Sequence, residues 1–137
     1  MAGPSDGARI WSLNFRLSTV VLGEATPAIE ALGIETKEFF VLDSVEELNY
    51  PALIAERLSM SRPMIALHVR HLEDKGLLTR EMDQSDLRRH RLRLTDEGHV
   101  TTDKARELLS DCYNARLERF SGAEKDHFAA LLAKLVE

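Results

Sequence analysis

The most distinctive chemistry in the sequence lies in the stretch "DLRRHRLRLT", Asp86 to Thr95, which holds four arginines and one histidine in ten residues. Arginine binds phosphates and carboxylates well, because its guanidinium presents several N–H donors in a rigid fork. The chain as a whole is acidic, with 23 Asp and Glu against 18 Lys and Arg and a net charge of −5. Between Arg57 and Arg93, however, nine basic residues accompany only five acidic ones. This local excess of positive charge favours nucleic acid as a partner more strongly than the negative net charge of the whole chain argues against it.

The length and composition favour a single-domain globular protein over a secreted, disulfide-rich or membrane protein. A chain of 137 residues is long enough for one domain with a real core, and its apolar and charged fractions are typical of a soluble globular protein. Cys112 is the only cysteine, which excludes an internal disulfide framework and fits a reducing cytoplasm. The first residues lack the apolar segment of a secretory signal, and no stretch is long enough to span a bilayer. We therefore expect a cytoplasmic protein with no membrane partner.

Helical patterns surround the basic stretch. Apolar residues at spacings of three and four predict a long helix over residues 8–32, in which Pro27 should mark a kink or a junction. Gly33 should end this helix, and Thr36 can cap a second one that runs to about residue 48. A short helix then begins at Pro51, because proline is favoured in a first helical turn.

The next segment predicts a helix-turn-helix. Ser59 and Met60 form a two-residue turn, Ser61 caps a basic helix, and Gly76 ends it. Two short helices joined by a tight turn, with the second one basic, are typical of this motif.

A β-hairpin follows directly. "LLTREM" predicts a strand and "DQSD" a turn, and "HRLRLT" alternates so that Arg91 and Arg93 lie opposite His90, Leu92 and Leu94. Thr95 should cap a long helix that runs to about Arg119, and a capping box at Ser121 should begin the last one. The expected fold is mainly α with a small β-hairpin wing, in the order ααααββαα.

The segment Gly76–Gly98 resembles the wing of the MarR family of bacterial transcription regulators. The family signature is Asp-x-Arg, five residues, and Leu-Thr, which Asp86, Arg88, Leu94 and Thr95 match without a gap. The resemblance extends over the helix-turn-helix and covers nearly the whole chain from about Ile10. Leu87 departs from the family, which often has arginine there.

This resemblance implies a single MarR-type domain over residues 1–137. Residues 8–48 and 95–136 would form a helical dimerisation and support region, and residues 49–94 the DNA-binding lobe. The implied function is that of a homodimeric transcription regulator, a repressor that binds a pseudo-palindromic operator in double-stranded DNA. Recognition helix 61–75 would enter the major groove, and wing 77–94 would contact the flanking DNA.

The expected DNA-binding residues fall into two groups. On the recognition helix, the outward positions are Ser61, Arg62, Pro63, Ala66, Leu67, Arg70 and His71, and Ile65, Val69 and Leu72 should hold the helix to the core. On the wing, the resemblance assigns Arg88 to the minor groove and Asp86 to anchoring the wing through a salt bridge, with an arginine of the helix-turn-helix as a candidate partner. Arg89 and Arg91 are interpreted as phosphate contacts or solvent-facing strand residues, and Arg93 as solvent-facing.

Many members of the family release DNA when a small aromatic or phenolic acid binds between the dimer helices and the winged lobe. The residues that would line such a cleft here are Trp11, Phe15, Arg16, Phe39 and Asp43. The three aromatic residues in this set fit a place in the dimer core better than a contact with a ligand.

Two other functions fit the sequence. A winged-helix protein-interaction module would explain why Ala66 and Leu67 stand where the family commonly has polar or basic residues. A redox sensor would act through Cys112, whose default role is that of a buried structural thiol. His68 and His71 share a helix face, but no cysteine or acidic residue stands at a convincing ligand spacing, so we expect no metal. No nucleophile–base pair or phosphate-binding glycine loop appears, so we expect neither an enzyme nor a cofactor.

Overall fold

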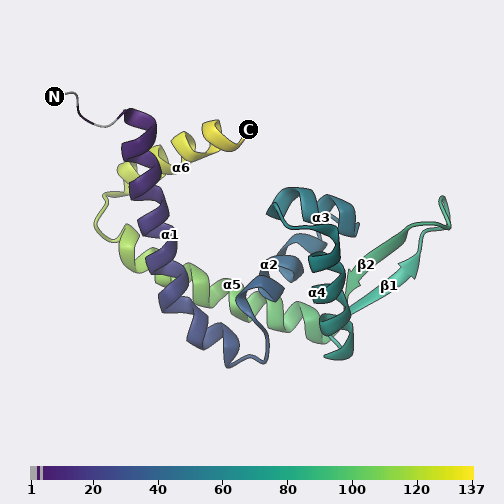
Figure 1. Cartoon of the computed structure of the whole chain (residues 1–137). Helices are drawn as coiled ribbons and strands as arrows, with labels where there is room; N and C mark the ends of the chain where they lie inside the picture. Colours follow the sequence, from purple (N-terminus) through teal and green to yellow (C-terminus); the bar gives the residue numbers. More distant parts are fainter. Residues whose placement is uncertain (1–2, 4) are drawn as a thin grey trace. The chain divides into compact units, whose positions relative to one another are not determined.

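The computed structural model describes Gly3 and residues 5–137, and within them it contains six helices and one β-hairpin in the predicted order (Figure 1). The elements are α1 (Asp6–Glu30), α2 (Thr36–Val45), α3 (Pro51–Leu58), α4 (Arg62–Asp74), β1 (Leu78–Met82), β2 (His90–Leu94), α5 (Asp96–Leu117) and α6 (Gly122–Val136). The prediction of a mainly helical winged helix-turn-helix is confirmed. No helix in this described part of the chain is long and apolar enough to cross a membrane.

The ends of α1 and α2 follow from local chemistry, with one correction. Pro27 lies inside α1, and the helix continues past it to Glu30. Gly33 adopts a φ of 88°, a left-handed conformation in which a side chain would be strained, and so terminates the helical stretch as predicted. The cap of α2 is Glu35 and not Thr36, because Glu35 and Glu38 form a reciprocal capping box around the first turn.

The chain forms two compact units, which we call the winged unit (Ala25–Leu108) and the helical unit (residues up to Glu24 together with Leu109–Glu137). In the winged unit, α2 packs against α3, α4 and β2, and α4 also packs against α3 and β1. The core between these elements contains fully buried side chains from every one of them: Phe39, Leu42, Ile54, Ile65, Leu72, Leu78 and Leu92. This unit therefore has its own hydrophobic core.

The helix-turn-helix is formed by α3 and α4. The turn passes through Ser59 at a φ of 52°, which reverses the chain within two residues. Ser61 then caps α4 by accepting a hydrogen bond from the backbone N–H of Met64 at 3.3 Å. The end of α4 is set by Gly76, whose φ is 76°.

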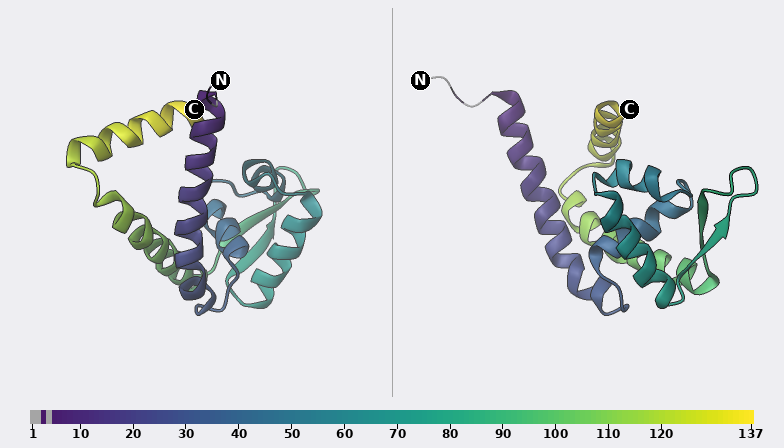
Figure 2. Two further views of the ribbon diagram at one scale, coloured as in Figure 1. Left: turned by 60° about the vertical axis from the view of Figure 1, so that its left-hand side comes forward. Right: turned by 45° about the vertical axis from the view of Figure 1, so that its right-hand side comes forward.

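The wing is the antiparallel hairpin of β1 and β2, and it projects from the end of α4 (Figure 2). Leu78 pairs with Leu94 at its base, and Met82 pairs with His90 near the turn. Along β2, Leu92 and Leu94 are buried while Arg91 and Arg93 are exposed, as the alternation predicted, but His90 is exposed because it lies next to the turn, beyond the core. The hairpin thus contributes apolar side chains to the core at its base and polar ones to solvent toward its tip.

The helical unit contains the first part of α1, the last part of α5 and all of α6. The side chain of Arg116 forms an ion pair with Glu24 at 2.6 Å, and the rings of Phe120 and Phe128 meet edge to face at 5.5 Å. No residue of α6 is buried. Ser121 caps this helix through the predicted capping box with Glu124.

Candidate nucleic-acid interface

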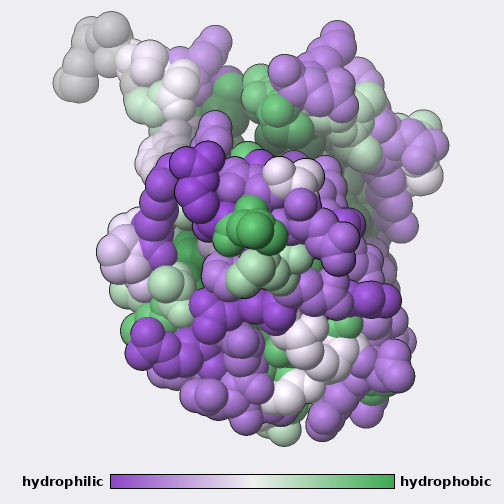
Figure 3. Space-filling view, turned by 90° about the vertical axis from the view of Figure 1, so that its right-hand side faces the viewer, coloured by the Kyte–Doolittle hydropathy of each residue, from purple (hydrophilic) through white to green (hydrophobic). Residues whose placement is uncertain are grey.

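The recognition helix α4 has one buried and one exposed face. Ile65, Val69 and Leu72 are buried, as predicted. The seven residues predicted to contact DNA are all exposed: Ser61, Arg62, Pro63, Ala66, Leu67, Arg70 and His71. The surface on the side of the wing is mainly hydrophilic and carries separate apolar patches (Figure 3). An α-helix is narrow enough to enter the major groove of DNA, and this face of α4 is exposed for such a contact.

One polar residue of α4 is buried. His68 is only 4% exposed, and its two ring nitrogens have no hydrogen-bond partner in the described structure. It is therefore a core residue of the winged unit. Within Gly3 and residues 5–137, no three His, Cys, Asp or Glu side chains form a group that could hold a metal ion.

The tip of the wing presents Arg88. Its side chain is 92% exposed, and its Nε lies 3.3 Å from Oδ1 of Asp86. The same oxygen accepts a hydrogen bond from the backbone N–H of Arg88 at 3.1 Å. The charged partner of Asp86 is thus its neighbour in the turn rather than an arginine of the helix-turn-helix. Asp86 stabilises the turn, and its role as the anchor of the whole wing stays a prediction.

A second set of contacts, which the sequence did not predict, joins the wing to the start of α3. Tyr50, the N-cap residue of α3, donates a hydrogen bond from its hydroxyl to Oδ2 of Asp83 at 2.6 Å. The guanidinium carbon of Arg89 lies 3.7 Å from the centre of the Tyr50 ring, a cation–π contact. The backbone N–H of Leu92 also donates to the carbonyl of Asn49 at 2.7 Å. Asn49 and Tyr50 therefore hold the hairpin at two levels.

The hydrogen bond between Tyr50 and Asp83 shifts the pKa of both side chains. Hydrogen bonds from the Ser85 hydroxyl and from Tyr50 hold the pKa of the Asp83 carboxyl well below its ordinary value. Because the hydroxyl of Tyr50 donates to that carboxylate, and because the phenol is partly desolvated, the pKa of Tyr50 is raised. At neutral pH the pair is a carboxylate that accepts and a neutral phenol that donates.

The strands of the wing carry the remaining arginines. Arg91 is exposed and pairs across the hairpin with Glu81. Arg93 lies 3.4 Å from Oε1 of the same glutamate, which agrees with its interpretation as a solvent-facing strand residue. Arg91 is positioned on the exposed face near the tip, where a phosphate could meet it.

Two contacts fix the wing to the recognition helix. At the base, Thr95 donates a hydrogen bond to the carbonyl of Gly76 at 2.7 Å and accepts one from the N–H of Gly98 at 2.9 Å. Arg80 of β1 forms an ion pair with Glu73 of α4 at 2.9 Å. The Thr95 side chain thus caps α5 and joins it to the end of α4 at the same time.

The residues predicted to line an effector cleft belong to both units. In the helical unit, Trp11 is 66% and Phe15 56% exposed, their rings stack at 5.9 Å, and Arg16 is exposed. In the winged unit, Phe39 is a core residue at 2% exposure, and Asp43 forms an ion pair with Arg106 at 2.7 Å. A ligand would reach Phe39 only by displacing core side chains. The cleft itself stays a prediction.

Cys112, the candidate redox residue, is a free thiol on α5 with intermediate exposure, not the buried structural thiol expected by default. No second cysteine exists in the sequence to pair with it.

Comparison with known proteins agrees with this geometry. Residues 36–90, which contain α2, the helix-turn-helix and most of the wing, match the family model of the MarR family. A MarR-family transcriptional regulator from Rhodococcus sp. RHA1 is similar over 97% of both chains, with 21% identity and a TM-score of 0.83. CouR from Rhodococcus jostii RHA1, solved with p-coumaroyl-CoA, is similar over 97% of this chain and 95% of that chain, with 22% identity and a TM-score of 0.80.

The transcriptional repressor CouR has also been solved on a 23-mer DNA duplex, and that chain is 25% identical over 97% of this chain and 93% of its own, with a TM-score of 0.75. This chain is therefore similar to the MarR family in the sequence of residues 36–90, and it shares the fold of MarR-family regulators over nearly its whole length.

Proposed function

We propose that this protein is a homodimeric, sequence-specific DNA-binding regulator, a repressor that binds a pseudo-palindromic operator. The observation that carries the proposal is the winged unit itself. It contains a recognition helix, one face of which is exposed to solvent. It also contains a wing whose tip residue, Arg88, is exposed. A repressor of similar fold, CouR, has been solved on DNA, which supports the same role here.

The recognition helix would read bases through few side chains. Arg70 can donate two hydrogen bonds to a guanine in the major groove. Ala66 and Leu67 offer only apolar contact, which suits the methyl group of thymine. Arg62 and the exposed N-terminal turn of α4 would bind phosphates, where the helix dipole adds to the attraction.

The wing would contribute charge at the flanking minor groove. A narrow minor groove concentrates negative potential, and an exposed arginine is the side chain most often placed there. Arg88 has the required exposure, and Arg91 behind it would contact the phosphate backbone.

Dimerisation would bury the apolar surface of the helical unit. On α1, four large apolar residues are each more than half exposed: Ile10, Trp11, Leu13 and Phe15. On α6 the exposed set is Leu131, Leu132, Leu135 and Val136. So many exposed large apolar side chains on two helices are unusual on a monomer and typical of an obligate interface. A second copy of the chain is the partner that places two recognition helices on the two half-sites of an operator.

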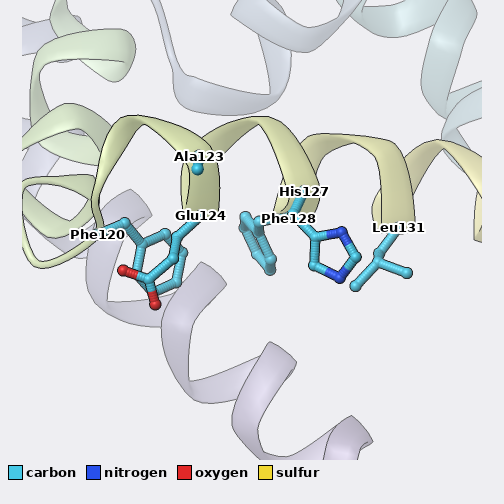
Figure 4. A pocket seen from close by; sticks show the side chains of 6 residues that line it. All are labelled: Phe120, Ala123, Glu124, His127, Phe128 and Leu131. Atoms are coloured by element: carbon cyan, nitrogen blue, oxygen red, sulfur yellow. The ribbon is translucent and has the colours of Figure 1, made fainter.

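A hollow in the helical unit belongs to the same surface. It is lined by side chains that project from one side of α6 and from the preceding loop: Phe120, Ala123, Glu124, His127, Phe128 and Leu131 (Figure 4). The lining is mainly apolar, so side chains of a partner helix would fit it better than solvent.

The experiment that tests DNA binding compares two arginines. An operator is first selected by sequencing genomic fragments that the purified protein retains at moderate salt. Arg70→Ala should then weaken binding to it by about 1–3 kcal/mol and relax preference at one position per half-site. Arg88→Ala should weaken binding to operator and scrambled duplex alike, and it should lower the slope of log affinity against log salt by about one.

Arg119→Ala, an exposed arginine of the helical unit, is the matched control and should change neither quantity. All three variants should keep the thermal stability of the parent. An Arg88→Ala protein with parental affinity and salt slope would show that the wing does not touch DNA. The protein-interaction module would then be the better interpretation.

The proposal includes a small aromatic compound as effector, since CouR has been solved with p-coumaroyl-CoA, a thioester that carries a phenolic ring. Salicylate should quench the fluorescence of Trp11, the only tryptophan, and weaken operator binding over the same concentration range. Linkage requires operator DNA to weaken salicylate binding by the same factor. Equal salicylate affinity with and without operator would exclude it as the inducer.

A further inference from the structure

The contact between Tyr50 and the wing joins residues far apart in the sequence. Tyr50 immediately precedes α3, whereas Asp83 and Arg89 lie at the two sides of the wing turn. The turn itself is closed by one backbone hydrogen bond between these two residues, in which the N–H of Asp83 donates to the carbonyl of Arg89 at 3.0 Å. Tyr50 therefore contacts both sides of the turn through one side chain.

Asp83 is fully engaged by these contacts. Its Oδ1 accepts hydrogen bonds from the backbone N–H and the hydroxyl of Ser85, at 2.9 Å and 2.6 Å. Its Oδ2 accepts the hydroxyl of Tyr50. The first set shapes the turn, and the second attaches the turn to the helix-turn-helix. One carboxylate thus couples the shape of the wing tip to its position.

We propose that Tyr50, Asp83 and Arg89 form a wing latch, a positioning device that sets how far the wing tip stands from α3 and leaves Arg88, not Arg89, to contact DNA. The proposal rests on the proposed function and deepens it. It changes the expected role of Arg89 from a phosphate contact to a cation held by an aromatic ring.

The two adjacent arginines differ in a way that supports this division. The guanidinium of Arg89 stacks on the Tyr50 ring, next to the Asp83 carboxylate that the same ring holds. Arg88 is 92% exposed, and its charged neighbour in the turn, Asp86, lies at 3.3 Å. A guanidinium over an aromatic ring beside a carboxylate is already compensated, so a phosphate gains less by binding it. The freer arginine is the better minor-groove ligand.

The first arm of the test uses no DNA. Amide hydrogen exchange of residues 83–92 is measured in the full-length protein, in Tyr50→Phe, in Asp83→Asn and in the double variant. Each single change should accelerate exchange in the turn by roughly three- to tenfold, the effect of one lost hydrogen bond. Because both changes remove the same bond, the double variant should exchange little faster than either single one. Tyr113→Phe, which removes the other tyrosine hydroxyl of the chain, is the control and should leave the wing unchanged.

The second arm measures operator affinity across a salt series. Arg88→Ala should lower the salt slope by about one, while Arg89→Ala should weaken binding severalfold with an unchanged slope, because no phosphate contact is lost. Tyr50→Phe keeps the ring under Arg89 and should affect affinity less than Tyr50→Ala. The affinity losses of Tyr50→Phe and Asp83→Asn should again be far from additive.

Three results would overturn the latch. One is a salt slope that falls by about one in Arg89→Ala, because Arg89 would then contact a phosphate. Another is additivity of Tyr50→Phe and Asp83→Asn in affinity, which would mean that the Tyr50 hydroxyl binds DNA directly. The third is unchanged exchange of the wing turn in both single variants.

A parent protein that binds no duplex would instead overturn the proposed function and the latch's role in DNA binding. Coupled exchange in that same protein would still establish Tyr50–Asp83 as a contact that positions the wing.

Discussion

The winged unit and the helical unit both contain many apolar residues, but they differ in how far these side chains are buried. All but one of the buried hydrophobic residues of the described chain lie in the winged unit, and the exception is Val21 on α1. The helical unit holds most of the exposed large apolar side chains, from Ile10 and Trp11 to Leu135 and Val136. The winged unit is therefore complete as a single copy, whereas the helical unit has apolar faces without an apolar partner.

This difference has an energetic reason. Burying a leucine or phenylalanine side chain stabilises by about 1.5–3 kcal/mol, and the helical unit obtains little of this from its own chain. A second copy would supply the missing surface, so the stability of the helical unit should depend on protein concentration and that of the winged unit should not. The proposed function thus places assembly and DNA reading in different parts of one small chain.

The largest expected effect is on assembly. Leu135 is 77% exposed, so Leu135→Asp removes no buried contact within the chain. If α6 lies in the dimer interface, this change buries an unpaired charge and should raise the dimer dissociation constant by at least about a hundredfold. Removal of all residues after Ser121 should abolish the dimer, as judged by light scattering.

The same measurement on Leu53→Asp, an exposed leucine of the winged unit, provides the control and should give an intact dimer. A dimer that survives both the Leu135 change and the truncation would show that the α6 stripe is not the interface.

The next effect concerns the core of the winged unit. A Cβ on Gly98 would overlap the carbonyl oxygen of Leu77, which is backbone and cannot move aside cheaply. Gly98→Ala should therefore destabilise the protein by about 3 kcal/mol or more, measured by urea unfolding. Gly23→Ala, in α1, meets no atom within 4 Å and should be neutral or slightly stabilising. Equal stability of the two variants would contradict the close packing of α5 on the base of the wing.

A smaller effect is expected for an ion pair that serves the same unit. Glu38 is 1% exposed, and one of its oxygens accepts hydrogen bonds from Lys75 at 2.8 Å and from the N–H of Glu35 at 2.8 Å. Lys75→Met leaves this carboxylate without its cation and should cost about 1–3 kcal/mol in urea unfolding. The combined change Glu38→Gln and Lys75→Met should cost less than Lys75→Met alone, since no charge is then buried. A greater loss in the double variant would contradict this account.

The smallest effect is a pH dependence of the wing. The pKa of Asp83 is lowered, so its contribution to stability is present above the ordinary value of about 3.9 and is lost as the pH falls through the lower folded value. The pKa of Tyr50 is raised, so its contribution is present below about 10 and is lost as the pH rises through the higher folded value. Carbon NMR of labelled tyrosine should show Tyr50 titrating above its ordinary value, and Asp83→Asn should lower that value. An unchanged Tyr50 titration in Asp83→Asn would contradict the hydrogen bond.

Much of the winged unit could be predicted from the sequence because its signals are local. The Ser61 cap, the left-handed Gly76 and the alternation of Leu92 and Leu94 each depend on neighbouring residues, and the structure contains all of them. The same holds for the two faces of α4, where helical periodicity alone separates Ile65 and Val69 from the exposed side. The cap of α2 was predicted wrongly, since Thr36 was expected and the capping box of Glu35 and Glu38 begins the helix instead.

Only the tertiary structure decided which residues distant in the sequence are in contact. Tyr50 meets Asp83 across 33 positions and Lys75 meets Glu38 across 37. No periodicity or motif links such pairs, since they meet only after the hairpin and the helices have packed on a common core. The arginine cluster shows both sides of this division. Its composition predicted a nucleic-acid partner, but the fold placed Arg89 over an aromatic ring, Arg93 near Glu81 and Arg88 out in solvent, because packing rather than composition sets the surroundings of each side chain.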